Sequence, residues 1–402
     1  MLQRLRSWGS CEAERIGRVN CENTVTMRES SHKKVTNMNV SIMGAGLAGL
    51  ACAIELEKHG VQPTIYEARS GVGDRFINAE IFASIFSRRV TDEVRYLGEE
   101  HGIYLHPTSN VTNLVIHSRN RKASLTGPVG FTTIRGRHRD SLERQLAEQV
   151  RADIQFDSKK TVQDLVREHT HVVVATGDVM DVQPMQRLEP DLTVTLTGRT
   201  VEGEFAPTEV MAWFDGRFAP DGGYGFLIPL SSSEASVTLA FPEYRKRTEQ
   251  EVESLWNAFL TRVCEDTRQQ LRPVDAFHVH GYAMGLPRYP RIGNMLFVGN
   301  CFGAMMPAAG FGQFSSILTG IYAARDICGF GKYEELTAGI RRSYGHSLAL
   351  RRLIEVLDDD GIDKVIERLD GYWGEKLIHT EANVLKWASY ASRLVLAVSG
   401  RP

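Results

Sequence analysis

The pattern of apolar residues begins at 40–43, where the short run V-S-I-M leads directly into a glycine-rich turn at 44–49. Residues 47–58 are good helix formers, and Gly60 follows them as a C-terminal cap. A second apolar run, V-Q-P-T-I-Y-E, occupies 61–67. This order predicts a buried strand, a helix and a second strand, which is the opening unit of a parallel α/β sheet.

The turn in this first unit reads G-A-G-L-A-G, and the acidic residue Glu67 follows Gly49 by 18 residues. A strand before the turn, a helix after it and an acid about 20 residues on are the context of a dinucleotide-binding fingerprint. Gly44 permits the tight turn, Gly46 lets the backbone approach a pyrophosphate, and Gly49 permits close packing of helix on strand. A glycine turn without a ligand is the alternative. We expect these residues and Ala48 to bind the adenosine diphosphate half of a dinucleotide.

Two more segments have the same strand-to-glycine pattern. Residues 171–178, H-V-V-V-A-T-G-D, form a β-branched strand that closes on Gly177. Residues 295–298 form another strand, which meets Gly299, and a loop at 307–312 then leads into a helix of small and apolar residues. A dehydrogenase that binds only a nicotinamide dinucleotide does not need this distant unit, whereas a cofactor with a long second half does.

Composition limits the classes of function. The chain has 402 residues, of which 42% are hydrophobic and 24% are charged, as in an ordinary globular protein with room for two domains. Its 47 basic and 49 acidic side chains give a formal net charge of -2, which provides no field to attract nucleic acid. No apolar run reaches the roughly 18 residues that span a membrane. We expect a cytoplasmic protein that does not bind nucleic acid.

Cysteine and histidine spacing gives no sign of a metal or of disulfides. The 6 cysteines are widely spaced, with no C-x-x-C pair, which fits a reducing compartment. His278 and His280 alternate in F-H-V-H-G and therefore share one strand face, but no third ligand is recognisable nearby. No metal site is predicted.

The first 38 residues are polar, mix Arg with Glu and lack an apolar stretch, which argues against a secretory signal. We expect residues 1–38 to form a disordered leader, with Met27 and Met38 as alternative start positions.

The ordered motifs resemble a known class of flavoprotein. G-A-G-L-A-G with Glu67, A-T-G at 175–177, and V-G-N at 298–300 followed by P-A-A-G-F-G at 307–312 are similar to FAD proteins of the para-hydroxybenzoate hydroxylase class. A further stretch, P-D-G-G-Y-G-F-L-I-P at 220–229, resembles the P-G-G-Y-G-W-x-F-P signature of the geranylgeranyl reductase branch. In that branch the segment belongs to a substrate-binding sheet that faces the flavin, and the substrates are prenyl chains whose isolated double bonds are reduced.

The resemblance implies a set of site residues at matching positions. Besides the fingerprint glycines, Ala48 and Glu67, the residues implied to bind FAD are Arg75, Arg139, Gly177, Gly299, Asn300, Gly310, Phe311 and Gly312. The implied substrate contacts are Gly223, Tyr224 and Phe226, and the implied catalytic residues are Tyr224, Pro307 and Gly310. Backbone N–H groups of the 307–312 loop would stabilise charge that develops on the reduced flavin. Tyr224 would either donate a proton or form a pocket wall, and the alternative for Arg75 is a solvated charge on a loop. Arg139 opens the segment R-D-S-L-E-R-Q-L, whose Leu142 and Leu146 mark one face of a predicted helix.

The chain also departs from the family pattern. Asn300 stands where the family usually has aspartate, Thr176 replaces the aspartate of A-D-G, and Phe226 replaces a tryptophan. Leu230 occupies a frequent lysine position, and the cysteine of many prenyl reductases is absent from 70–79. A neutral amide makes weaker hydrogen bonds than a carboxylate, so we expect FAD binding to be weakened but retained.

Together these features predict an α/β fold with a discontinuous Rossmann-like FAD-binding domain, an inserted antiparallel-sheet substrate domain and a helical C-terminal region. The FAD-binding segments are 39–80, 139–184 and 286–330; the substrate segments are 81–138 and 185–285; the helical region is 331–402. A helix at 383–399 has an apolar stripe that includes Val384, Trp387 and Leu394. We expect this stripe to pack on the protein body, and a membrane-surface helix is the alternative.

The expected function is FAD-dependent reduction of carbon-carbon double bonds in a hydrophobic, prenyl-type or lipid substrate. The resemblance leaves open a flavin-dependent monooxygenase or halogenase on the same scaffold, and a non-catalytic carrier of prenylated partners similar to Rab escort and GDP-dissociation-inhibitor proteins. No second G-x-G-x-x-G is found for a stable nicotinamide domain. The reductant would then be transiently bound NAD(P)H or a protein electron donor, and peripheral membrane contact would suit a lipid substrate.

Overall fold

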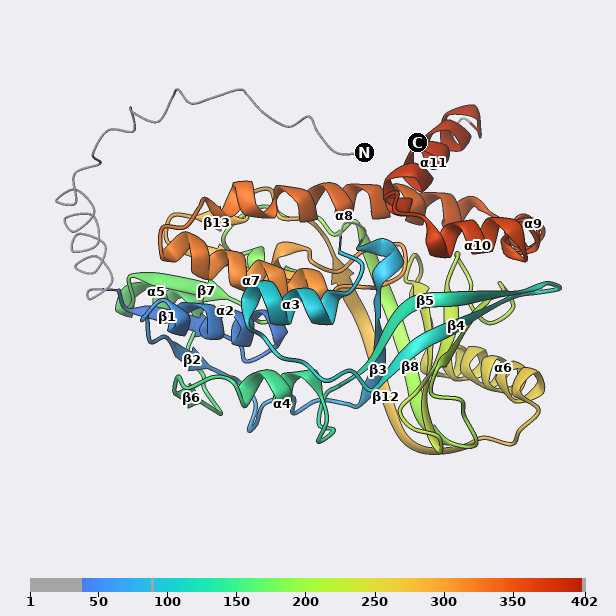
Figure 1. Cartoon of the computed structure of the whole chain (residues 1–402), viewed down its shortest axis with the longest axis horizontal. Coiled ribbons are helices and arrows are strands. Elements are labelled where there is room, and N and C mark those ends of the chain that lie inside the picture. The colour runs from blue at the N-terminus through green and yellow to red at the C-terminus, as the bar shows by residue number, and fades with distance from the viewer. Residues whose placement is uncertain (1–37, 88–89, 400–402) are drawn as a thin grey trace, which may run out of the picture. The chain divides into compact units, whose positions relative to one another are not determined.

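The computed structural model describes residues 38–87 and 90–399, and the predicted leader at 1–38 lies outside this range apart from Met38. Asn39–Pro402 form one compact unit. The expected α/β architecture is confirmed: Figure 1 shows a small sheet with helices on its faces beside a larger, twisted sheet.

The smaller sheet has six strands in the order β13-β14-β7-β1-β2-β6. Its strands are β1 (Val40–Met43), β2 (Thr64–Tyr66), β6 (Ile154–Gln155), β7 (His171–Val174), β13 (Arg291–Ile292) and β14 (Met295–Phe297). All pairs are parallel except β13–β14. Val172 and Val174 are fully buried beside Leu165 of α5 (Val162–Glu168). Burial on both faces explains why the strands read as short, continuous apolar runs.

Two helices lie together on the other face of this sheet (Figure 1). They are α2 (Leu47–Lys58), which follows β1, and α7 (Gln313–Ile327), which follows β14 and the 3₁₀ helix η3 (Gly299–Phe302). The two helices are far apart in sequence, but each follows the carboxyl end of a strand of the same sheet. These strands, β1 and β14, lie on either side of β7. In open α/β sheets ligands bind at this edge.

The larger sheet has eight strands in the order β12-β8-β11-β10-β9-β4-β5-β3. Its strands are β3 (Asn78–Ala83), β4 (Ser109–Ser118), β5 (Lys122–Arg135), β8 (Leu192–Glu202), β9 (Glu209–Phe214), β10 (Tyr224–Pro229), β11 (Glu234–Pro242) and β12 (Arg272–Met284). The predicted antiparallel pattern holds except for β4 and β9, which pair in parallel. This pair joins the two chain segments that build the sheet, so no hairpin fixes its direction.

One face of the larger sheet packs on α6 (Glu249–Thr267) around Trp213, Trp256 and Phe259, which are at most 2% exposed. The opposite face looks toward the C-terminal helices (Figure 1). These are α8 (Tyr333–Val356), α9 (Asp359–Leu369), α10 (Tyr372–His379) and α11 (Val384–Ser399). The remaining elements are α3 (Glu93–His101), α4 (Leu142–Ala147) and the 3₁₀ helices η1 (Ser84–Phe86) and η2 (Val179–Val182).

The last helix does not pack as its apolar stripe predicts. In its described part, α11 buries Leu385, Ser389 and Ser392, whereas Trp387 is 64% exposed. Residues 385, 389 and 392 share one helical face, and residue 387 lies on the opposite one. The expectation that Trp387 packs on the body is therefore wrong, because α11 offers small serine side chains to α8. The side chain of Leu394 lies outside the described residues.

Candidate functional site

A cavity of about 2370 Å³ lies where the two sheets and the C-terminal helices meet. Most residues implicated by sequence line this cavity. They are Gly44, Gly46, Ala48, Glu67, Arg75, Gly177, Tyr224, Phe226, Gly299, Asn300, Pro307, Gly310, Phe311 and Gly312. Gly49, Arg139 and Gly223 are not part of its lining.

The N-terminus of α2 opens into this cavity at Gly46. Gly46 is the N-cap and provides no side-chain hydrogen bond to the first turn, so the N–H groups there remain available. A β-carbon at Gly46 would meet no atom within 4 Å, which leaves room for a ligand against the backbone. The Glu67 carboxylate accepts hydrogen bonds from the N–H groups of Ala45 (2.8 Å) and Arg69 (2.9 Å). Glu67 therefore ties the end of β2 to the glycine turn.

The other two fingerprint glycines have a steric role. Gly44 has φ of +111°, and a β-carbon there would lie 2.4 Å from the Ala175 carbonyl oxygen. A β-carbon at Gly49 would lie 2.0 Å from the Gly44 carbonyl oxygen. Both positions therefore require glycine for folding, and only Gly46 has open space on its ligand side.

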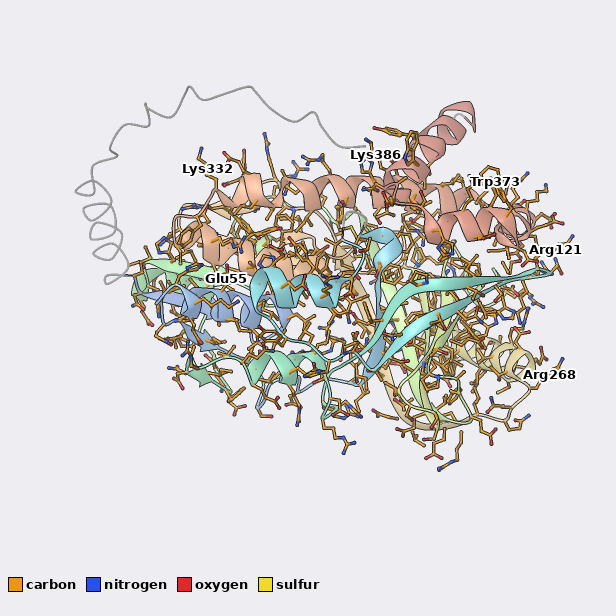
Figure 2. All side chains as sticks on the ribbon, in the orientation of Figure 1. Glu55, Arg121, Arg268, Lys332, Trp373 and Lys386 are labelled. Carbon is orange, nitrogen blue, oxygen red and sulfur yellow. The ribbon has the colours of Figure 1, made fainter. Side chains whose placement is uncertain are left out.

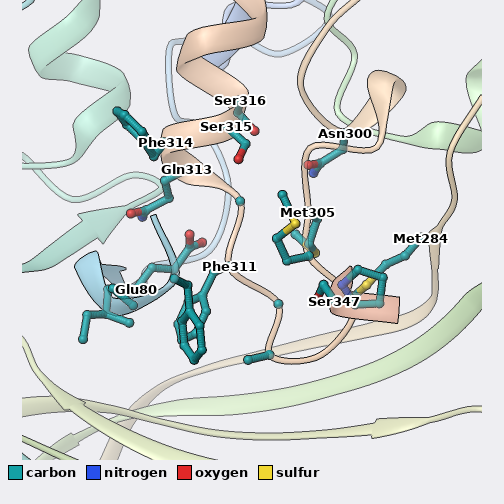
Figure 3. A pocket seen from close by; sticks show the side chains of 18 of the residues that line it. Glu80, Met284, Asn300, Met305, Phe311, Gln313, Phe314, Ser315, Ser316 and Ser347 are labelled. Atoms are coloured by element: carbon teal, nitrogen blue, oxygen red, sulfur yellow. The ribbon is translucent and has the colours of Figure 1, made fainter. Parts of the chain in front are cut away.

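A second uncapped helix N-terminus, that of α7, opens into the same cavity. Its N-cap, Gly312, contributes no side-chain cap, so the first-turn N–H groups face the cavity without an intrahelical partner. Figure 3 shows Gln313, Ser315 and Ser316 on this first turn, with Phe311 below it and Asn300 across the opening. The two helix N-termini give the cavity wall two regions of positive potential.

The side chain of Asn300 takes part in a neutral hydrogen-bond group. Its Nδ2 atom donates to the carbonyl of Gly177 (3.3 Å) and contacts the hydroxyl of Tyr282. The Tyr282 hydroxyl in turn donates to the Gly177 carbonyl (3.3 Å), and burial raises the pKa of this phenol. The Asn300 amide oxygen therefore keeps its capacity to accept a hydrogen bond from a ligand. Tyr282, in β12, gave no signal in the sequence.

Arg75 belongs to a cluster of charged groups in the cavity wall. Arg135 donates to Glu143 (2.8 Å) and to both carboxylate oxygens of Glu80 (3.2 Å each), while Arg75 donates to Asn78 (3.2 Å). Burial and the neighbouring Arg135 lower the pKa of Arg75, and its Nε atom is buried with no hydrogen-bond partner. An unsatisfied guanidinium nitrogen beside a cavity is suited to an anionic ligand group.

The structure does not bring Arg139 into this site. Its side chain is 85% exposed and pairs with Asp140 (3.3 Å), and the helix it was expected to open begins only at Leu142. In this part of the chain Arg135 lines the cavity instead, because β5 runs on to that residue and the chain then turns at Gly136, where φ is +86°.

The glycines beside Tyr224 also differ from expectation. Tyr224 and Phe226 line the cavity from the same strand, β10, with their rings tilted by 33° and their centroids 5.9 Å apart. β-carbons at Gly223 and Gly225 would instead meet Phe241 (2.6 Å) and Phe259 (2.3 Å), two residues of the core between the larger sheet and α6. Alternation along the strand places Gly225 on the face that packs on α6. Gly223, implied to contact substrate, is not part of the cavity lining.

Beyond Tyr224 the cavity wall becomes apolar. The residues there come from the inner face of the larger sheet and from α9 and α10, and they include Ile81, Leu114, Val129, Val210, Ile228, Ile362, Ile366, Leu369 and Leu377. Charged lining residues are concentrated at the glycine-turn side and on α8 and α11. Among residues 38–87 and 90–399, no group of three His, Cys, Asp or Glu side chains is placed to bind a metal ion. His278 and His280 contact each other, and no third ligand completes a site with them.

Comparison with known proteins agrees with this geometry. A family model described as an NAD(P)-binding Rossmann-like domain matches residues 42–92. No curated protein matches the chain by sequence. A geranylgeranyl bacteriochlorophyll reductase-like protein from Thermoplasma acidophilum is similar in structure, with 15% identity over 88% of this chain and 95% of its own, at a TM-score of 0.67.

Two flavoenzymes of other types are similar to a comparable degree. The flavin-dependent brominase Bmp2 has 13% identity over 90% of this chain and 99% of its own, at a TM-score of 0.60. The flavin-dependent monooxygenase PieE, solved with FAD and substrate, has 13% identity over 89% of this chain and 72% of its own, at a TM-score of 0.56. Identities this low establish the fold and leave the reaction open. The chain has a Rossmann-type dinucleotide-binding domain within the fold of flavin-dependent oxidoreductases.

Proposed function

We propose that this protein is an FAD-dependent oxidoreductase that reduces carbon-carbon double bonds of a hydrophobic, prenyl-type substrate. The observation that carries the proposal is the division of one cavity into two regions. One region holds two uncapped helix N-termini and a partly unsatisfied arginine, and the other is an apolar chamber between the sheet face and α9–α10.

The residues present fit FAD. Gly46 leaves the backbone of α2 open to a diphosphate, and the unsatisfied Arg75 Nε would neutralise part of its charge. Asn300 would accept a hydrogen bond from the ribityl chain, and the first turn of α7 would bind the polar edge of the isoalloxazine. Arg139 is omitted from this set because its side chain lies in solvent.

The volume of the cavity supports a second ligand beside the cofactor. Pockets for one drug-sized ligand measure roughly 300–1,000 Å³, and the cavity measures about 2370 Å³. The residues that α9 and α10 contribute to the cavity lining are all apolar, so this chamber favours a hydrocarbon chain; they are Ile362, Val365, Ile366, Leu369 and Leu377. This chamber supports an alkene substrate more directly than a charged one.

Bound FAD would supply hydride transfer between a reductant and the substrate. The chain's own residues would exclude water, through the aromatic wall of Phe214, Tyr224 and Phe226, and would stabilise negative charge, through the N–H groups at the start of α7. Burial raises the pKa of Tyr224 to about 12, so its phenol stays protonated at neutral pH. Its proton is donated to the Ala309 carbonyl (2.7 Å), which favours a structural role over proton donation to substrate.

The test begins with the absorption spectrum of the purified, desalted protein. A two-band flavin spectrum that bleaches under anaerobic NADPH would establish FAD and a nicotinamide donor; bands that persist would point to a protein donor. The reduced protein is then mixed anaerobically with a C20 isoprenoid alcohol. Reoxidation with loss of one double bond supports the proposal, and no reoxidation by any prenyl substrate rejects it.

A monooxygenase or halogenase is the second candidate, because Bmp2 and PieE share the fold. Substrate-dependent oxygen consumption with a hydroxylated or halogenated product would favour it. The lysines in the cavity lining are Lys159, Lys160 and Lys386, which come from the β6–α5 connection and from α11. None of these lysines belongs to β10 or to the 307–312 loop, the two segments assigned to the substrate and the flavin.

A non-catalytic prenyl carrier is the third candidate, and absence of flavin binding would bring it forward. The open Gly46 cradle counts against it, because a carrier has no use for a diphosphate site.

No helix among the described residues has the length and hydropathy to cross a membrane. We further propose contact with a membrane surface through α10 and α11, which expose the aromatic residues Tyr372, Trp373, Trp387 and Tyr390. Figure 2 shows Trp373 and Lys386 projecting from these helices.

A further inference from the structure

The loop that leads into α7 is closed by its own backbone. Within residues 306–312, hereafter the flavin loop, the Met306 N–H donates to the Phe311 carbonyl (2.7 Å) and the Gly310 N–H donates to the Met306 carbonyl (2.9 Å). Gly310 has φ of +70°, a conformation that glycine adopts without strain. These two bonds close the turn and leave the Ala308 N–H and the Ala309 carbonyl oxygen to bind partners outside the loop.

Two side chains from distant elements hold those peptide groups. The Ala308 N–H donates to Oγ of Ser347 (2.9 Å), and the Tyr224 hydroxyl donates to the Ala309 carbonyl (2.7 Å). Ser347 is fully buried in α8, 39 residues beyond Ala308. Figure 3 shows Ser347 beside the loop, on the side away from the α7 first turn.

We propose that Ser347, together with Tyr224, is a positioning residue that fixes the flavin loop in the conformation that binds FAD. The proposal rests on the proposed function, because the loop is assigned to the flavin there. Ser347 restrains the N–H of the Pro307–Ala308 peptide, and Tyr224 restrains the carbonyl of the Ala309–Gly310 peptide. The two side chains, from α8 and β10, therefore hold the peptide planes on either side of the Ala308–Ala309 peptide. The orientation of the segment that continues to Gly312 and the N-terminus of α7 depends on those planes.

Loss of either restraint affects the loop before it affects the rest of the fold. Without the Ser347 hydroxyl, the N–H of Ala308, a residue only 5% exposed, is left buried and unpaired. Such a group costs about 1–3 kcal/mol unless it finds a new partner. The residues of the loop line the cavity, so opening of the loop toward the cavity would give this N–H a partner in solvent. A preformed loop binds a ligand more tightly than one that must be ordered on binding.

The first experiment needs no flavin. Amide hydrogen exchange is measured on peptides that cover the flavin loop in the full chain, for wild type, Ser347→Ala and Tyr224→Phe. The matched control is Thr337→Val, since Thr337 is fully buried in the same helix but donates its hydroxyl to the Tyr333 carbonyl of that helix (2.6 Å). We expect loop exchange to rise about tenfold in both test variants and to stay at the wild-type rate in the control.

The second experiment measures the FAD dissociation constant and the flavin absorption bands of the same proteins. We expect about tenfold weaker binding and shifted bands for Ser347→Ala, with both largely restored in Ser347→Thr, which keeps the hydroxyl. Unchanged loop exchange in Ser347→Ala would overturn the proposal. Faster loop exchange in Ser347→Ala with wild-type FAD affinity would also overturn the proposal about Ser347, but it would not contradict the proposal that the protein binds FAD. A wild-type chain that binds no FAD would instead reject the proposed function, and the assigned role of Ser347 with it.

Discussion

Gly320 of α7 lies against Ala48 of α2 so closely that a β-carbon at Gly320 would come within 2.0 Å of the Ala48 carbonyl oxygen. This contact lies within the first turn of α2 and the second turn of α7. The two helices therefore bring their uncapped N-termini to one cavity because a glycine allows their backbones to touch. The spacing between the two positive helix ends, and with it the site for a dinucleotide, depends on this crossing.

Replacement of Gly320 by alanine will separate the two helices. The β-carbon cannot be accommodated beside a backbone oxygen, so we expect a loss of about 1–3 kcal/mol in unfolding free energy, together with weaker FAD binding. Urea unfolding and flavin titration measure the two effects. Gly339→Ala in α8 is the control, because a β-carbon there meets no atom within 4 Å. It should be neutral or stabilising by about 0.5–1 kcal/mol. Equal effects of the two substitutions would contradict this account.

Gly46→Ala should separate cofactor binding from folding. The backbone of Gly46 has φ of −88°, which alanine adopts freely, and its β-carbon would project into open space. We expect the melting temperature without flavin to stay within the wild-type error and the FAD dissociation constant to rise about 10- to 100-fold, from steric conflict with the diphosphate. A titration followed by flavin fluorescence tests this.

The comparison for Gly46→Ala is Gly44→Ala. At Gly44, φ is +111° and the added carbon would meet the Ala175 carbonyl oxygen at 2.4 Å. This variant should lose stability whether or not flavin is present. If Gly46→Ala destabilised the flavin-free protein as much as Gly44→Ala does, the open space at Gly46 would have no ligand-binding meaning.

Local chemistry explains why the fold was predictable. The strand at 40–43, the glycine turn and the helix after it are specified within about 20 neighbouring residues. The apolar pattern of the strand, the glycines of the turn and the helix formers that follow all favour the same local structure. The parallel pairing of β4 with β9 was not predictable, because it joins segments about 95 residues apart whose register is set by the assembled core.

The site was less predictable where a residue acts across elements. Ser347 reads as an ordinary helix residue, and only the packing of α8 on the loop gives it a partner. Arg139 was implied by the family resemblance and by its place at the start of a helical pattern, yet the length of β5 brings Arg135 to the cavity lining. The apolar stripe that contains Trp387 predicted that this face of α11 is buried. The structure instead buries the face that carries Ser389 and Ser392, which the apolar periodicity could not indicate.

His101 provides a test of pH dependence outside the cavity. Its ring is 4% exposed, and Arg325 donates to its Nδ1 atom (3.1 Å), so the ring is neutral. Burial, reinforced by Arg325 and Lys58 and opposed by Glu55, lowers its pKa to about 4. The unfolded chain binds a proton at an ordinary histidine pKa near 6.5. The contribution of His101 to the free energy of unfolding is therefore fully present above about pH 6.5 and is lost as the pH falls toward 4.

We expect the wild-type protein to lose about 2 kcal/mol of unfolding free energy through His101 between pH 7 and pH 5. His101→Gln keeps an acceptor for Arg325 but cannot titrate, so its pH profile should be flatter by that amount. Urea unfolding at the two pH values measures the difference. Parallel profiles for the two proteins would show that His101 is protonated in the folded state as readily as in the unfolded one.

Contact with a membrane surface should depend on the exposed tryptophans of α10 and α11. Trp373 and Trp387 are 63% and 64% exposed, and Trp387 also lines the cavity, so a lipid surface at Trp387 would lie next to the cavity. Indole rings favour the interface between headgroups and acyl chains. We expect each substitution, Trp373→Ala or Trp387→Ala, to weaken co-sedimentation with phosphatidylcholine vesicles about tenfold. Tyr104→Ala, at a 67% exposed ring after α3, should leave it unchanged; equal losses would mean non-specific adsorption.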